Sequence, residues 1–105
     1  MNDKQMLELA AKACDFELLD CTCKKERKNS VTGKHWNPLT DDGDALRLAV
    51  KLKMSLDLFD DFIVAGYTTN NNDCLQIEEP HENEPIPATR RAITRAAAEI
   101  GGRYE

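Results

Sequence analysis

The feature that most constrains the fold is a loop that turns into a helix at residues 36–52, WNPLTDDGDALRLAVKL. Thr40, Asp41 and Asp42 can each cap the helix, and acidic residues at a helix start complement the positive end of the helix dipole. A second start of the same type occurs at residues 84–93, EPIPATRRAI, where a proline takes the first helical position. The sequence therefore predicts two well-specified helices in a folded domain.

The first of these helices has a wide apolar surface. On a helical projection of residues 44–52, at roughly 100° per residue, the apolar side chains cover about 200° of arc. An arc this wide predicts a helix that packs on a sheet and is flanked by another helix. Its apolar members are Ala45, Leu46, Leu48, Ala49, Val50 and Leu52.

Two further elements are predicted before this helix. Asp3 can cap a helix over residues 3–14, where apolar residues recur at three- and four-residue intervals. Residues 16–21 alternate as a short strand. Residues 24–34 carry charge and turn residues without a period, which predicts a loop or the tip of a hairpin that closes near Trp36.

A small antiparallel meander is predicted after this helix, because short apolar runs alternate with acidic or asparagine-rich turns. The segments are strands at 56–59, 62–67 and 74–77, turns at 60–61 and 70–73, and an acidic connector at 80–85.

The last helix has an alanine-rich face, which permits close approach to the sheet or to the helix at 44–52, and Gly101-Gly102 ends it. Its other face holds Arg90, Arg91, Thr94, Arg95 and Ala98.

Together these elements predict the α+β class. A chain of 105 residues fits a single domain with one modest core, so we expect one domain over residues 1–105. The expected architecture is a small α/β/α sandwich in the order α-β-α-β-β-β-α, with a mainly antiparallel sheet.

The charge of the chain is unevenly distributed. Nineteen acidic and 14 basic residues give a net charge of −5, which opposes non-specific binding to nucleic acid or to an anionic membrane. No Lys or Arg occurs between Lys53 and Arg90. The same interval holds Asp57, Asp60, Asp61, Asp73, Glu78, Glu79, Glu82 and Glu84. These carboxylates form either solvated faces that keep a small protein in solution, or an acidic surface that docks a basic partner or imitates the phosphates of DNA.

Eight residues form the candidate interaction surface. Trp36 is either a core residue that covers the end of a helix or an exposed anchor for a partner. The arginines are either a solvated helix face or a site for an acidic protein or nucleic acid. The eight residues are Trp36, Arg90, Arg91, Arg95, Asp60, Asp61, Glu78 and Glu79.

No arrangement typical of catalysis is found. The sequence has no glycine-rich phosphate loop and no nucleophile elbow, so we expect no enzyme activity and no cofactor. Cys21 and Cys23, with His35, Cys74 or His81, could bind zinc, but a spacing of one residue is shorter than that of structural zinc sites. On a strand the two cysteines would share one face as small residues, and we expect no metal.

No secretion signal and no run of about 20 apolar residues is present, which predicts a cytoplasmic protein with reduced thiols and no membrane contact.

The two helix starts resemble those of the phage ABA sandwich domain family. The resemblance is carried by residues 36–52 and by residues 88–101, ATRRAITRAAAEIG, and extends over nearly the whole chain. The chain departs from the family pattern at Glu84, where Asp or Asn often precedes the proline, and in its longer basic loop at 24–34. The resemblance implies an α/β sandwich encoded by a phage or prophage. It implies no activity, and no functional residue is carried over from it.

Two hypotheses for the function follow. The first is a non-catalytic phage protein that binds a host protein, such as a defence factor. The alternative is a small accessory module that binds a ligand or nucleic acid through the arginines and Trp36. We expect a monomer or a small homo-oligomer.

Overall fold

The computed structural model describes residues 2–14, 18–20, 27–29, 35–68, 74–80 and 84–102. Strands β1 and β2 form an antiparallel pair, and β3, β4 and β5 form a three-stranded antiparallel sheet in that order. The α+β class and the antiparallel sheet are therefore confirmed. The elements are α1 (Asp3–Ala13), β1 (Leu18–Asp20), β2 (Arg27–Asn29), α2 (Asp42–Lys51), β3 (Ser55–Leu58), β4 (Phe62–Thr68), β5 (Cys74–Pro80) and α3 (Pro85–Gly102).

Two details of this order differ from the sequence prediction. Strand β2 is an additional strand that pairs with β1, so residues 24–34 include part of a hairpin. Strand β5 continues to Pro80, three residues beyond the predicted end at Ile77. The predicted turn at 70–73 lies outside the described residues.

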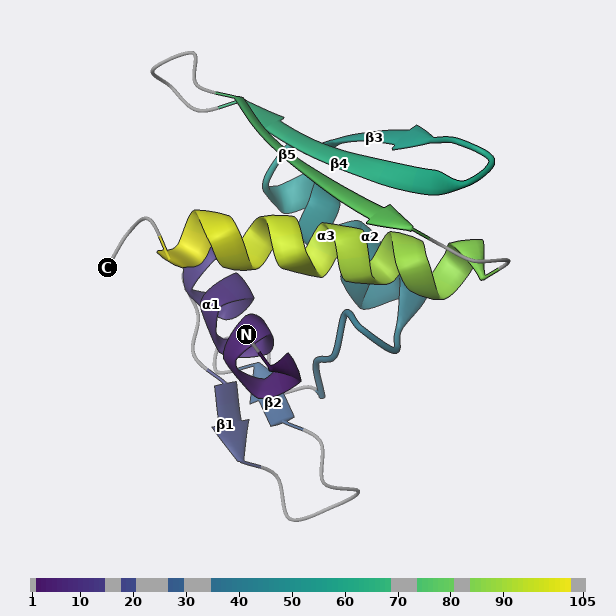
Figure 1. The fold of residues 1–105 in the computed structure, drawn as a ribbon. Helices are drawn as coiled ribbons and strands as arrows, with labels where there is room; N and C mark the ends of the chain where they lie inside the picture. Colours follow the sequence, from purple (N-terminus) through teal and green to yellow (C-terminus); the bar gives the residue numbers. More distant parts are fainter. Residues whose placement is uncertain are drawn as a thin grey trace.

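Helix α3 is the centre of the fold. The three-stranded sheet lies on one side of α3, α1 crosses its other side, and α2 packs beside it, so all three helices lie on one side of the sheet (Figure 1). Half of the helix is buried as a result. The buried residues are Ala88, Ala92, Ile93, Thr94, Ala96, Ala97, Ala98, Ile100 and Gly101.

The close approach of α3 is to α1. A Cβ on Gly101 would overlap the backbone carbonyl of Leu9, so only glycine allows the two backbones to lie this close. The sequence prediction placed Thr94 and Ala98 on the polar face, and this is wrong because both are fully buried. The Thr94 hydroxyl donates to the Arg90 carbonyl at 2.8 Å, which satisfies the polar group inside the helix.

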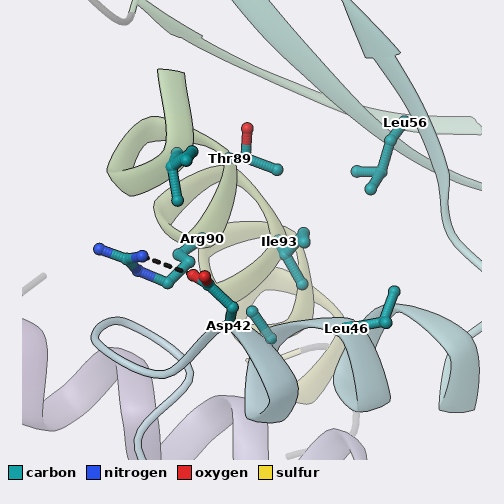
Figure 2. Close-up of a pocket in the computed structure, with 8 residues that line it drawn as sticks. Asp42, Leu46, Leu56, Thr89, Arg90 and Ile93 are labelled. Carbon is teal, nitrogen blue, oxygen red and sulfur yellow. Dashed lines mark hydrogen bonds and ion pairs between the residues drawn. The ribbon is translucent and has the colours of Figure 1, made fainter. Parts of the chain in front are cut away.

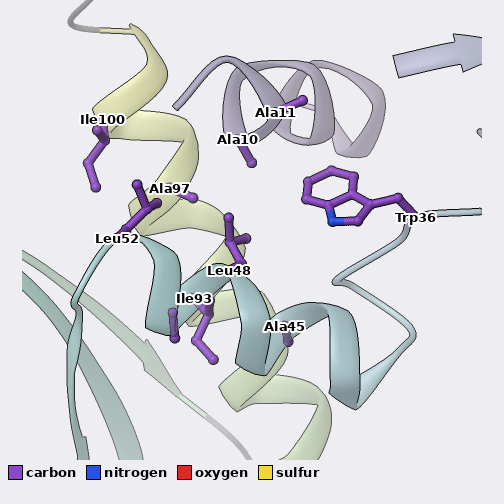
Figure 3. Close-up of a cluster of buried hydrophobic side chains, with 10 residues drawn as sticks. Ala10, Ala11, Trp36, Ala45, Leu48, Leu52, Ile93, Ala97 and Ile100 are labelled. Atoms are coloured by element: carbon purple, nitrogen blue, oxygen red, sulfur yellow. The ribbon is translucent and has the colours of Figure 1, made fainter. Parts of the chain in front are cut away.

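The main core lies between α1, α2 and α3. Trp36 is 8% exposed and packs with Ala10 and Ala11 of α1 and with Leu48 of α2 (Figure 3). The interpretation of Trp36 as a core residue is therefore confirmed. A second cluster joins the inner face of β4, at Ile63 and Ala65, to the alanines of α3.

The helix caps agree with the sequence prediction at α2 and differ at α1. Asp41 caps α2, because its side chain accepts the Asp44 N–H at 2.8 Å. The cap of α1 is Asn2 rather than Asp3, since Asn2 and Gln5 form a reciprocal capping box. Asp3 is then the first helical residue.

Candidate functional site

The loop before α2 is held together by its own polar groups. The Asp44 carboxylate is nearly buried and accepts the Asn37 N–H at 2.9 Å and an Arg47 N–H at 2.8 Å. The Asn37 side chain in turn accepts the Leu39 N–H at 3.0 Å. The hydrogen bond from Arg47 to Asp44 raises the pKa of the guanidinium. The carboxylates of this motif therefore serve the fold and leave little capacity for a ligand.

Arg90 joins the start of α3 to this loop. Its Nε donates to the Leu39 carbonyl at 2.9 Å, and its terminal nitrogen pairs with Asp42 at 2.5 Å. The Arg90 side chain is 19% exposed. Arg90 is therefore a structural bridge between two segments that are far apart in the sequence, rather than part of a solvated face.

Arg91 and Arg95 converge on Glu79 of β5. Arg95 forms an ion pair with Glu79 and also donates to the Glu78 carbonyl at 3.4 Å. Arg91 lies 3.7 Å from the Glu79 carboxylate and 3.5 Å from Asp3 of α1. The Glu79 side chain is 13% exposed, so this charge is almost enclosed by the two arginines.

Helix α2 is covered on one side only. Ala45, Leu48 and Ala49 are buried, whereas Leu46 is 61% exposed and Val50 is 68% exposed. The prediction that a sheet and a neighbouring helix cover the whole apolar arc is therefore wrong for Leu46 and Val50. The reason is that Ala45, Leu48 and Ala49 meet Trp36, α1 and α3 in the main core, whereas Leu46 and Val50 lie outside that core.

An apolar hollow of about 200 Å³ separates α2 from the inner face of β3 (Figure 2). Leu46 of α2 and Leu56 of β3 lie on two of its walls, and the ion pair of Asp42 and Arg90 lies at its margin (Figure 2). Ile86, at the start of α3, lines the hollow and is 59% exposed. The full lining is Asp42, Ala45, Leu46, Leu56, Ile86, Thr89, Arg90 and Ile93.

The outer face of the β3–β4–β5 sheet combines aromatic rings with carboxylates. The rings of Phe59 and Phe62 stack with centroids 4.7 Å apart, and Phe59 is 50% exposed. Asp57 and Glu78 lie on either side of Val64 in one row across the sheet, and both are exposed. Asp60 and Asp61 are exposed at the adjoining turn, and the sequence from 54 to 89 supplies no cation. We call Asp57, Phe59, Asp60, Asp61, Phe62 and Glu78 the acidic aromatic face.

The eight sequence candidates therefore do not form one surface. Trp36 is in the core, Arg90 is at the margin of the hollow, and Arg91, Arg95 and Glu79 form a cluster beside β5. Asp60, Asp61 and Glu78 belong to the acidic aromatic face.

Sequence reasoning missed the apolar members of the exposed surfaces. The excess width of the apolar arc was the signal for Leu46 and Val50. Phe59 directly follows Leu58 and so breaks the apolar–polar alternation of residues 56–58, and this break was the signal for the exposed ring.

The described part of the chain contains neither a cluster of metal ligands nor a helix that could span a membrane. No three His, Cys, Asp or Glu residues within it are placed to hold a metal ion. Cys21, Cys23 and His81 lie outside it, and the Cys74 side chain is likewise not described. Among its helices, none combines the length and apolar character needed to span a bilayer.

No protein-family model, curated protein or solved structure matches this chain.

Proposed function

We propose that this chain is a small, non-catalytic interaction protein, encoded by a phage or prophage, that docks a basic protein of its bacterial host. The observation that carries the proposal is the acidic aromatic face, where the half-exposed Phe59 ring stacks on Phe62 beside exposed carboxylates, in a stretch of sequence without Lys or Arg. The resemblance of the two helix starts to a phage family supports the origin and a place in the host cytoplasm.

Aromatic and charged residues have different roles at protein interfaces. Exposed aromatic rings supply much of the binding free energy once a partner excludes water from them. Charges around such a centre contribute mainly to the rate of association and to the choice of partner. Phe59 and Phe62 fit the first role, and the surrounding carboxylates fit the second for a partner rich in Lys or Arg, whose side chains also bind aromatic faces.

The state of the arginines favours this proposal over a nucleic-acid-binding module. Arg90, Arg91 and Arg95 are each already paired with carboxylates. Binding phosphate there would require these pairs to open, whereas the carboxylates of the acidic aromatic face are exposed.

The test is affinity capture from a bacterial lysate with the tagged chain, followed by binding measurements on three variants. The unmodified chain is expected to retain a basic protein near equal stoichiometry. The variant Phe59→Ala is expected to weaken binding of that protein, once purified, by about tenfold or more.

Charge is tested with two variants of equal net charge. Asp57→Asn with Glu78→Gln is expected to slow association, whereas the control Glu8→Gln with Glu99→Gln, which changes two helix residues, is expected to leave it unchanged. Equal binding by all variants, or capture of nucleic acid alone, would contradict the proposal.

A further inference from the structure

The two edges of the β3–β4–β5 sheet differ in how their outward backbone groups are satisfied. The Phe59 N–H donates to the Phe62 carbonyl at 3.0 Å, so these two residues form a hydrogen-bonded pair. Along an antiparallel pair of strands, hydrogen-bonded and non-hydrogen-bonded residue pairs alternate. Asp57 and Ser55 therefore bond to β4, and the N–H and C=O groups of Leu56 and Leu58 point away from the sheet.

The β5 edge is closed. By the same alternation its outward residues are Gln76, Glu78 and Pro80. Pro80 has no N–H to offer, and Arg95 donates to the Glu78 carbonyl. Proline and charged side chains are the usual means by which proteins prevent pairing at an edge strand.

The β3 edge contains no proline, and its one charged residue, Asp57, lies on the outer face of the sheet, opposite the face that borders α2. No described residue bonds to the outward groups of Leu56 and Leu58. The strand also borders the apolar hollow, whose α2 wall includes the exposed Leu46, and Leu58 itself is 69% exposed. Val50, one helical turn after Leu46, is exposed as well. An unpaired edge and an uncovered apolar surface therefore occur at the same place, which is typical of an interface.

We propose that a second copy of this chain covers this place, by pairing its β3 antiparallel to the first across a two-fold axis. The result is a continuous six-stranded sheet, with the exposed sides of the two α2 helices facing each other beneath it. The proposal goes beyond the proposed function and does not rest on it, because it is argued from the backbone edge at Leu56 and Leu58 and from the exposed Leu46 and Val50, none of which belongs to the acidic aromatic face. The two surfaces share only the turn at Asp60 and Asp61 and its neighbour Phe59.

Charge favours a second copy as the occupant. Lys51 and Lys53 are exposed just before β3, and Asp60 and Asp61 are exposed just after it. A two-fold axis between the ends of the strand places the cations of one copy beside the carboxylates of the other. The surface is therefore complementary to itself, as a symmetric dimer requires.

The register follows from the same argument. In an antiparallel pair of strands, two directly opposed residues point to the same face of the sheet. If the two-fold axis is perpendicular to the sheet, this is true only when the axis passes between the two copies of one residue. An axis at Asp57 would oppose two like charges, whereas an axis at Leu56 opposes Ser55 to Asp57 and lets the outward groups of the two Leu56 residues bond to each other. The axis at Leu56 also brings the turn that holds Lys53 in one copy near the turn that holds Asp60 in the other.

Sedimentation equilibrium of the full chain tests the proposal. The unmodified chain is expected to reach twice the mass of one chain as its concentration rises, and a mass of one chain throughout would overturn the proposal. Leu46→Asp is expected to weaken the dimer by about 30-fold or more, because it places a charge in the interface. The control Gln76→Asp places the same charge on β5 and is expected to leave the dimer unchanged.

A charge exchange tests the two-fold arrangement without relying on an apolar substitution. Lys53→Glu and Asp60→Lys are each expected to weaken the dimer by roughly threefold to tenfold. The variant that carries both changes is expected to regain the original dissociation constant, because the pair is re-formed with opposite sign. A double variant weaker than either single variant would overturn the antiparallel arrangement.

Discussion

The two sides of this molecule use apolar residues in opposite ways. On the closed side, formed by β5, α3 and α1, small residues are buried and the sheet edge is protected by Pro80 and Arg95. On the open side, formed by β3 and α2, large residues such as Leu46 and Val50 remain exposed beside an unprotected edge. An apolar sequence pattern therefore indicates how much surface must be covered. The pattern does not indicate whether the chain itself or a partner covers that surface.

The largest expected effect compares two leucines of α2. Leu48 is 2% exposed, so Leu48→Ala should lower the free energy of unfolding by about 3 kcal/mol, through lost contacts and a cavity. Leu46→Ala should change it by less than about 0.5 kcal/mol, because that side chain is already in water. Urea unfolding at a concentration where the chain is monomeric measures both. Equal losses at the two positions would show that the open side is part of the core.

Two neighbouring glycines of α3, on the closed side, differ in what surrounds them. Gly101→Ala should destabilise the chain by about 2 kcal/mol, because the added methyl group forces α1 and α3 apart. Gly102→Ala, one residue later, has no atom within 4 Å of the added carbon and should be neutral or slightly stabilising. Thermal unfolding of the two variants checks this difference. Equal midpoints would contradict the close approach at Leu9.

The smallest effect concerns the protected edge. Arg95→Ala removes the ion pair with Glu79 and the donor to the Glu78 carbonyl, and should cost about 1 kcal/mol. Lys4→Ala, at an exposed position of α1, is the matched control and should stay within about 0.5 kcal/mol of the unmodified chain. Urea unfolding measures both, and an unchanged stability of the Arg95 variant would show that these two contacts contribute nothing to the fold.

Local signals predicted most of the elements. Helix periodicity located α1, α2 and α3, and the turn at Asp60-Asp61 located the β3–β4 hairpin, because these features depend on neighbouring residues. The burial of Thr94 and Ala98 could not be predicted, since it depends on where α1 docks. The choice of Asn2 as the cap depended on the side chain of Gln5.

The candidate site was harder to predict than the fold. The partners of Arg90 and Arg95 lie 48 and 16 residues away, so their pairing follows from tertiary structure alone. The carboxylates at Asp60, Asp61 and Glu78 were found from charge. The exposed Leu46 and Phe59 were assigned to a helix and to a strand. The wide arc and the break in alternation indicate an excess of apolar surface there, but not which side chains stay exposed.

Amide hydrogen exchange shows whether a second copy covers the open side. The outward N–H groups of Leu56 and Leu58 on β3 are compared with those of Gln76 and Glu78 on β5 across a wide range of chain concentration. If β3 pairs with β3 of a second copy, amide exchange at Leu56 slows markedly as chain concentration rises, while Gln76 and Glu78 exchange at a constant rate. Exchange at Leu56 and Leu58 that is independent of concentration would contradict this pairing.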